Sequence, residues 1–152
     1  MGTARMHAHV ETPIEAAFDY LADFRHTPEW VTSIVELTAE GPMTKVGDRF
    51  SGTMRLLGRT YTGEGQVTGF EWPHLIAFAS TSSEGQHQTW TTRLTPEGSG
   101  TDVDMVIDYE VPMSLLGAIA DKLFIERTVQ RSLEQSRDNL VALVEHSVLQ
   151  PV

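Results

Sequence analysis

The chain has 152 residues, of which 40% are hydrophobic and 21% charged, a size and composition typical of a folded globular domain. Its formal net charge of −10 disfavours binding to nucleic-acid phosphates and to anionic membrane surfaces. The absence of cysteine excludes disulfides, thiolate metal ligands and a cysteine nucleophile.

The sequence also lacks the usual signals for secretion or membrane insertion. No apolar signal-peptide core stands near its start, and no run of about 18 apolar residues occurs in it. We therefore expect one domain spanning residues 1–152, located in the cytoplasm and without stable insertion into a membrane.

The first strand and two short helices are predicted before residue 31. Residues 5–11 alternate between apolar and polar side chains, which predicts a half-buried strand. His7 and His9 share its polar face, but no third ligand stands at a suitable spacing, so we expect no metal site. Apolar residues then recur at helical spacing over 14–24, and Pro28 opens a second short helical turn.

From residue 31 to residue 109 the apolar periodicity changes to two, which predicts six further strands. These strands are expected near 33–39, 48–57, 60–70, 74–81, 86–95 and 101–110. The turns between them are short, so neighbouring strands should pair antiparallel in a seven-stranded sheet. Several glycines within or beside the strands indicate a strongly curved sheet, namely those at positions 52, 58, 63, 65 and 69.

The last segment predicts one long helix from Ser114 to about residue 147, because no proline interrupts it. A curved sheet needs an element to enclose, and this helix can provide it. The sequence therefore predicts an α+β fold in which the sheet wraps around the C-terminal helix and leaves a largely apolar cavity between them.

Aromatic and other large apolar side chains are expected to line this cavity, as is usual in ligand sites. The alternative is that they form a filled core, and both interpretations stay open. The candidate ligand-binding residues are Trp30, Phe50, Met54, Tyr61, Phe78, Trp90, Met105, Tyr109, Leu123 and Phe124.

Three candidates could take part in proton chemistry. Tyr61 and Tyr109 carry hydroxyl groups that could orient a polar ligand group. Glu64 could act as a buried acid with a raised pKa, if its side of strand 60–70 faces inward. The sequence leaves the inward row of that strand ambiguous between the side of Tyr61 and the side of Glu64.

The C-terminal helix supplies a further group of charged residues over 126–137, mainly as an exposed face. One of these charged side chains could reach the cavity where the apolar stripe of the helix becomes thin. No nucleotide-binding or zinc-protease motif occurs in the sequence, so we expect no cofactor and no catalytic metal.

Four stretches of sequence carry a family resemblance that extends over nearly the whole chain: TPIEAAFDYLADFRHTPEW, KVGDRF, VTGFEWPHLIAFAS and TWTTRLTPEGSGTDVDMVIDYEVP. They resemble the bacterial polyketide cyclase/dehydrase and lipid-transport family, also called SRPBCC. The order of elements resembles the helix-grip fold of the Bet v 1/START-like superfamily. The resemblance implies ligand binding or transport most often, cyclase or aromatase activity in some members, and protein interaction in a few.

The leading hypothesis is that the cavity binds a small hydrophobic or amphipathic molecule, lipid-like or polyketide-like. One alternative is an enzyme of the polyketide cyclase, aromatase or dehydratase type that uses the same cavity. The other is a protein-interaction module, for which an apolar surface patch would be expected instead of a cavity. We expect the chain to be a monomer or a homodimer.

Overall fold

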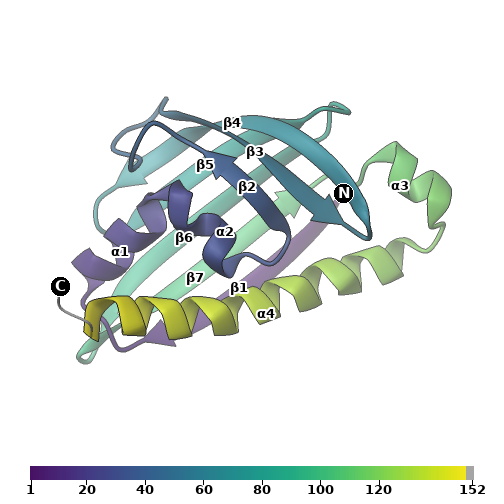
Figure 1. Cartoon of the computed structure of the whole chain (residues 1–152). Helices are drawn as coiled ribbons and strands as arrows, with labels where there is room; N and C mark the ends of the chain where they lie inside the picture. The colour runs from purple at the N-terminus through teal and green to yellow at the C-terminus, as the bar shows by residue number, and fades with distance from the viewer. Residues whose placement is uncertain (150–152) are drawn as a thin grey trace.

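Seven strands form one continuous antiparallel sheet in the computed structural model, which describes residues 1–149 (Figure 1). The strands are β1 (Gly2–Val10), β2 (Ile34–Thr38), β3 (Arg49–Leu56), β4 (Arg59–Glu71), β5 (Leu75–Ser82), β6 (His87–Glu97) and β7 (Gly100–Tyr109). Their order in space is β1-β7-β6-β5-β4-β3-β2, so β1 and β2 are the two edge strands. The predicted seven-stranded antiparallel sheet is confirmed.

The helices lie at two places in the chain order, after β1 and after β7. They are α1 (Ile14–Ala22), the 3₁₀ turn η1 (Phe24–His26), α2 (Thr27–Trp30), α3 (Met113–Ala118) and α4 (Lys122–Leu149). Figure 1 shows α1 and α2 near one end of the curled sheet, with α4 running along the sheet past β1. The two short helices after the first strand are as predicted.

The register of the four central strands arranges the inward side chains in rows across the concave face. The apolar row consists of the register partners Val67, Phe78, Trp90 and Ile107. The next row lies two residues away on each strand, and its register partners are Gly65, Ser80, Gln88 and Tyr109. Side chains two residues apart share a face, so these last three form a second inward row. We call Ser80, Gln88 and Tyr109 the polar row.

Strand β4, whose inward side was ambiguous in the sequence, turns Tyr61 and Val67 toward the interior. Both are buried, at 3% and 1% exposure, while Glu64 is exposed. Because successive side chains of a strand alternate between faces, burying Tyr61 sends Glu64 to the outer face of the sheet. The expectation of a buried acid at Glu64 is therefore wrong.

A glycine in β4 allows an aromatic ring to lie directly on the sheet. Gly65 pairs with Phe50 of β3, and a Cβ atom at Gly65 would come within 2.5 Å of Phe50 Cζ and 2.8 Å of the Ala79 carbonyl oxygen. No side chain fits in that space, so residue 65 must be glycine for the Phe50 ring to occupy this position.

The C-terminal helical segment consists of two helices, which corrects the prediction of a single helix from Ser114. Helix α3 ends at Ala118, and α4 begins at Lys122. Between them, the Asp121 carboxylate accepts a hydrogen bond from the Phe124 backbone N–H at 3.1 Å, as a helix N-cap does. The Ser114 hydroxyl, in turn, donates to Glu84 on the β5–β6 hairpin.

Helix α4 packs its buried side chains against the sheet and hydrogen-bonds to the edge strand β1. The Gln130 side chain accepts from the Arg5 N–H at 3.1 Å and donates to the Arg5 carbonyl oxygen at 2.8 Å. Near the other end of β1, Glu145 accepts from the Glu11 N–H at 2.7 Å. These contacts satisfy backbone groups that an edge strand would otherwise leave unpaired, and they hold α4 beside the concave face.

Candidate functional site

A cavity of about 170 Å³ lies between the concave face of the sheet and α4. Strands β2 to β7 form most of its wall, and α4 closes it with Val129, Ser132, Leu133 and Ser136. Exposed residues of the lining include Thr62, Thr81, His87 and Glu110. Thr62, Thr81 and His87 alternate with the inward Tyr61, Ser80 and Gln88, so their side chains lie on the outer face of the sheet. Glu110, directly after β7, marks the rim where the cavity reaches the protein surface.

One wall of the cavity is aromatic. The rings of Phe50 and Phe78 meet edge to face at 5.0 Å between centroids, and the Phe78 ring stacks on Trp90 at 5.7 Å. Behind them, Phe24 contacts both phenylalanine rings, at 5.0 Å and 5.3 Å. This packing fixes the rings in place and gives the cavity a rigid apolar surface.

The polar row lies beside this aromatic wall, and all three of its residues line the cavity. Burial raises the pKa of the Tyr109 phenol, and the nearby Glu126 carboxylate raises it further. The Tyr109 hydroxyl therefore keeps its proton and can donate a hydrogen bond. The register thus produces a cavity with an apolar side and a hydrogen-bonding side.

The Tyr61 hydroxyl is a second polar group at this cavity. Tyr61 lines the cavity and is 3% exposed, and within residues 1–149 its hydroxyl oxygen has no hydrogen-bond partner. Most buried hydroxyl groups are hydrogen-bonded, because an unpaired one costs about 1–3 kcal/mol. A ligand oxygen or nitrogen in the cavity would provide the missing partner.

The part of α4 that lines the cavity is neutral, with Val129, Ser132, Leu133 and Ser136, so the alternative of a charged side chain at this place is not met. Ser136 accepts a hydrogen bond from the Thr32 N–H at 3.0 Å, and the hydroxyls of Ser132 and Thr32 lie 2.8 Å apart. These serines are small enough to leave space for the cavity, and their hydrogen bonds join α4 to the start of β2.

The structure brings six of the ten predicted ligand-binding residues to this cavity: Phe50, Met54, Tyr61, Phe78, Trp90 and Tyr109. Trp30 and Met105 line a smaller cavity of about 30 Å³, which shares Phe78 and Trp90 with the main one.

Leu123 and Phe124 line neither cavity and are 52% and 49% exposed. They lie off the stripe of α4 that packs against the sheet, because that stripe begins at the fully buried Ile125. Ser80 and Gln88 were not predicted, although the alternation that placed Trp90 inward also places Gln88 inward.

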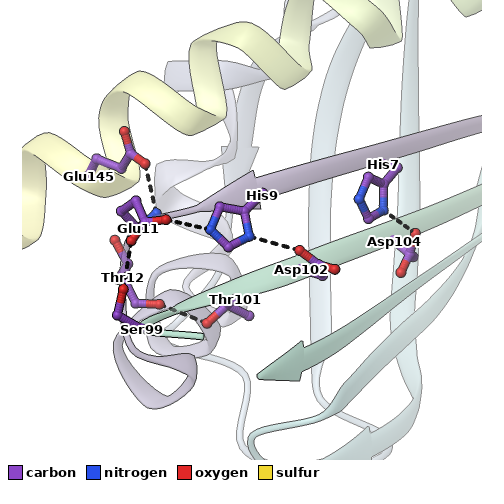
Figure 2. A network of polar contacts seen from close by, with 9 residues as sticks. All are labelled: His7, His9, Glu11, Thr12, Ser99, Thr101, Asp102, Asp104 and Glu145. Carbon is purple, nitrogen blue, oxygen red and sulfur yellow. Dashed lines mark hydrogen bonds and ion pairs between the residues drawn. The ribbon is translucent and has the colours of Figure 1, made fainter. Parts of the chain in front are cut away.

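The outer face of β1 and β7 carries a row of polar contacts (Figure 2). His7 Nδ1 lies 2.7 Å from Asp104, and His9 lies 2.8 Å from Asp102 and 2.6 Å from Glu11. Hydrogen bonds to these last two carboxylates raise the pKa of His9, with the larger effect from Asp102. This network lies on the face opposite the cavity.

Within residues 1–149, no three histidine or carboxylate side chains come together in a way that could hold a metal ion. In the same range, no helix has both the length and the apolar character needed to cross a membrane.

A family model described as polyketide cyclase / dehydrase and lipid transport matches residues 1–145. The chain belongs to this family. The family description names polyketide cyclase, dehydrase and lipid transport. No curated protein sequence gives a significant match.

Solved structures support the fold of this polyketide cyclase/dehydrase and lipid-transport domain. A START superfamily protein from Mycobacterium smegmatis matches with a TM-score of 0.78 and 15% identity, over 97% of this chain and 99% of that chain. A protein from Thermus thermophilus matches with a TM-score of 0.77 and 18% identity, over 95% and 98%. The protein Ara h 8.0201 matches with a TM-score of 0.65 and 11% identity, over 93% and 96%. At such identities the likeness shows the fold alone, and the predicted helix-grip fold is confirmed.

Proposed function

We propose that this protein binds a small hydrophobic or amphipathic molecule, lipid-like or polyketide-like, in the cavity between the sheet and α4. The observation that carries the proposal is the combination of the aromatic wall with the unpaired Tyr61 hydroxyl at the same cavity, both within residues 1–149. A filled core would need neither the space nor a buried hydroxyl without a partner.

The size of the cavity limits the part of the ligand that it encloses. A dry apolar cavity of about 150 Å³ holds a benzene molecule, so a cavity of about 170 Å³ suits a ring system of similar or slightly larger size. The exposed rim at Glu110 leaves room for a longer ligand to extend toward solvent. The family description, which names polyketides and lipids, agrees with such a ligand.

The cyclase or dehydratase alternative has less support from the same residues. The ionisable groups that line the cavity are Tyr61, Tyr109, His87 and Glu110. Within residues 1–149, no two of these side chains form a hydrogen bond with each other, as a general base and the group that orients it usually do. Binding is therefore the function that we propose.

Nuclear magnetic resonance of the tryptophan indole N–H groups tests this proposal, with 2-naphthol as the probe. Trp90 lines the cavity, whereas Trp72 is 54% exposed and donates its indole N–H to Asp19 at 2.9 Å. Addition of 2-naphthol should shift the Trp90 signal in a saturable way and leave the Trp72 signal unchanged. If the Trp90 signal does not respond, or if both signals respond alike, the cavity does not bind the probe and the proposal fails.

A further inference from the structure

The cavity lining that the structure describes contains one histidine, His87, whose side chain lies on the outer face of the sheet beside Thr81. Among the lining residues that the structure describes there is no lysine or arginine, and Glu110 is the one carboxylate. A second carboxylate, Glu126, is close enough to affect the ionisation of Tyr109. The whole chain carries a net charge of −10, which adds to the negative field.

The hydrogen-bonding groups of the cavity are neutral. The polar row offers a hydroxyl, an amide and a phenol, and Tyr61 adds a second phenol whose hydroxyl lacks a partner within residues 1–149. Such groups can pair with a hydroxyl, keto or amide oxygen without leaving an uncompensated charge.

An anionic ligand would lose more hydration free energy in this cavity than the lining can replace. A carboxylate or phosphate that enters an apolar cavity loses hydration, and the protein must replace that hydration with a cation or several donors. The described lining of this cavity has no lysine or arginine to offer, and the side chain of its one histidine, His87, lies on the outer face. Glu110 at the rim repels a negative group.

We infer that the cavity selects uncharged amphiphiles with a hydroxyl, keto or amide end group and discriminates against ligands that end in a carboxylate or phosphate. This inference rests on the proposed binding function and names the chemical class of ligand for that site. The apolar part of the ligand lies against Phe78 and Trp90, and its polar end lies toward the polar row and Tyr61.

Three probes that share one ring system test the selection: 2-naphthol, 2-naphthamide and 2-naphthoate. At about pH 7 the first two are neutral and the third is ionised. Calorimetric titration should give 2-naphthoate an affinity at least about ten-fold weaker than that of 2-naphthol, with 2-naphthamide close to 2-naphthol. If 2-naphthoate binds as tightly as 2-naphthol, the inference is overturned while the proposed function stands. If none of the three binds, the proposed function fails and the inference falls with it.

A pair of charge-reversal variants tests the electrostatic cause. Glu110→Lys places a cation at the rim of the cavity, whereas Glu64→Lys makes the same change on the outer face; both glutamates are exposed. Glu110→Lys should narrow the preference for 2-naphthol over 2-naphthoate several-fold, and Glu64→Lys should leave it unchanged. Equal effects of the two variants, or no effect of Glu110→Lys in a protein whose circular dichroism shows it folded, would contradict the inference.

Discussion

At the scale of single residues, the Tyr61 hydroxyl should lower the stability of the free protein and strengthen ligand binding. It is buried without a hydrogen-bond partner in the described part of the chain. Replacing Tyr61 with phenylalanine removes an unpaired polar group, so we expect the free energy of unfolding to rise by about 1 kcal/mol. The same change should weaken 2-naphthol binding, because the cavity loses the hydroxyl that can donate a hydrogen bond to the ligand. Chemical denaturation and calorimetric titration measure the two effects.

A matched tyrosine provides the control for this substitution. The Tyr20 hydroxyl donates to Glu29 at 2.9 Å, away from the cavity lining. Tyr20→Phe should lower stability and leave 2-naphthol binding unchanged. A loss of stability in Tyr61→Phe, or an unchanged affinity for 2-naphthol in that variant, would show that the hydroxyl is not kept for a ligand.

His9 makes the stability of the β1–β7 edge depend on pH. Its pKa is raised in the folded protein by hydrogen bonds to Asp102 and Glu11, so folding favours the protonated form. The resulting stabilisation is fully present below the ordinary histidine pKa of about 6.5. It is lost as the pH rises through the raised pKa that His9 has in the folded protein. The pKa of Glu11 is lowered by His9 and Ser99, and its own contribution is lost only as pH falls through that lower value.

The variant His9→Gln tests this pH dependence. The melting temperature of the native protein should exceed that of the variant most below about pH 6.5, and the difference should shrink toward about pH 9. His146→Gln, on the exposed side of α4, serves as the control and should follow the native protein. A difference for His9→Gln that stays constant across this range would contradict the assignment.

At the scale of elements, the junction between α3 and α4 depends on Asp121. Its carboxylate caps α4 through the Phe124 N–H. Asp121→Ala should lower the free energy of unfolding by about 1 kcal/mol, as is typical for the loss of an N-cap. Asp138→Ala, which removes an exposed carboxylate from the middle of the same helix, should have a smaller effect. Chemical denaturation measures the free energy of unfolding of both variants. An equal decrease in the two variants would contradict the assignment of Asp121 as the helix cap.

The strands and the first two helices could be predicted because their signals are local. Alternation of apolar side chains and the turns between them define β1 to β7 without any knowledge of their partners. The break before α4 was missed because the prediction relied on the absence of proline, whereas an aspartate cap at residue 121 is enough to start a new helix.

At the scale of the whole molecule, the register of the sheet decides the character of the cavity. Pairing of β4 to β7 sets the apolar row beside the polar row, and the sequence does not state this register. The inward direction of Trp90 could be predicted from alternation within one strand. The cavity itself could not, because its volume depends on contacts between distant segments, such as Phe50 on Gly65 and Ser136 with Thr32.

Filling the cavity tests the central claim most directly. Ser80 belongs to the polar row, while its neighbour Ala79 is not part of the cavity lining. Ser80→Leu should reduce the affinity for 2-naphthol at least about ten-fold, because the larger side chain occupies the binding space. Ala79→Leu, the same residue introduced one position away, should keep the affinity of the native protein. Calorimetric titration of the two variants decides: binding by Ser80→Leu that equals that of the native protein would contradict a ligand site in this cavity.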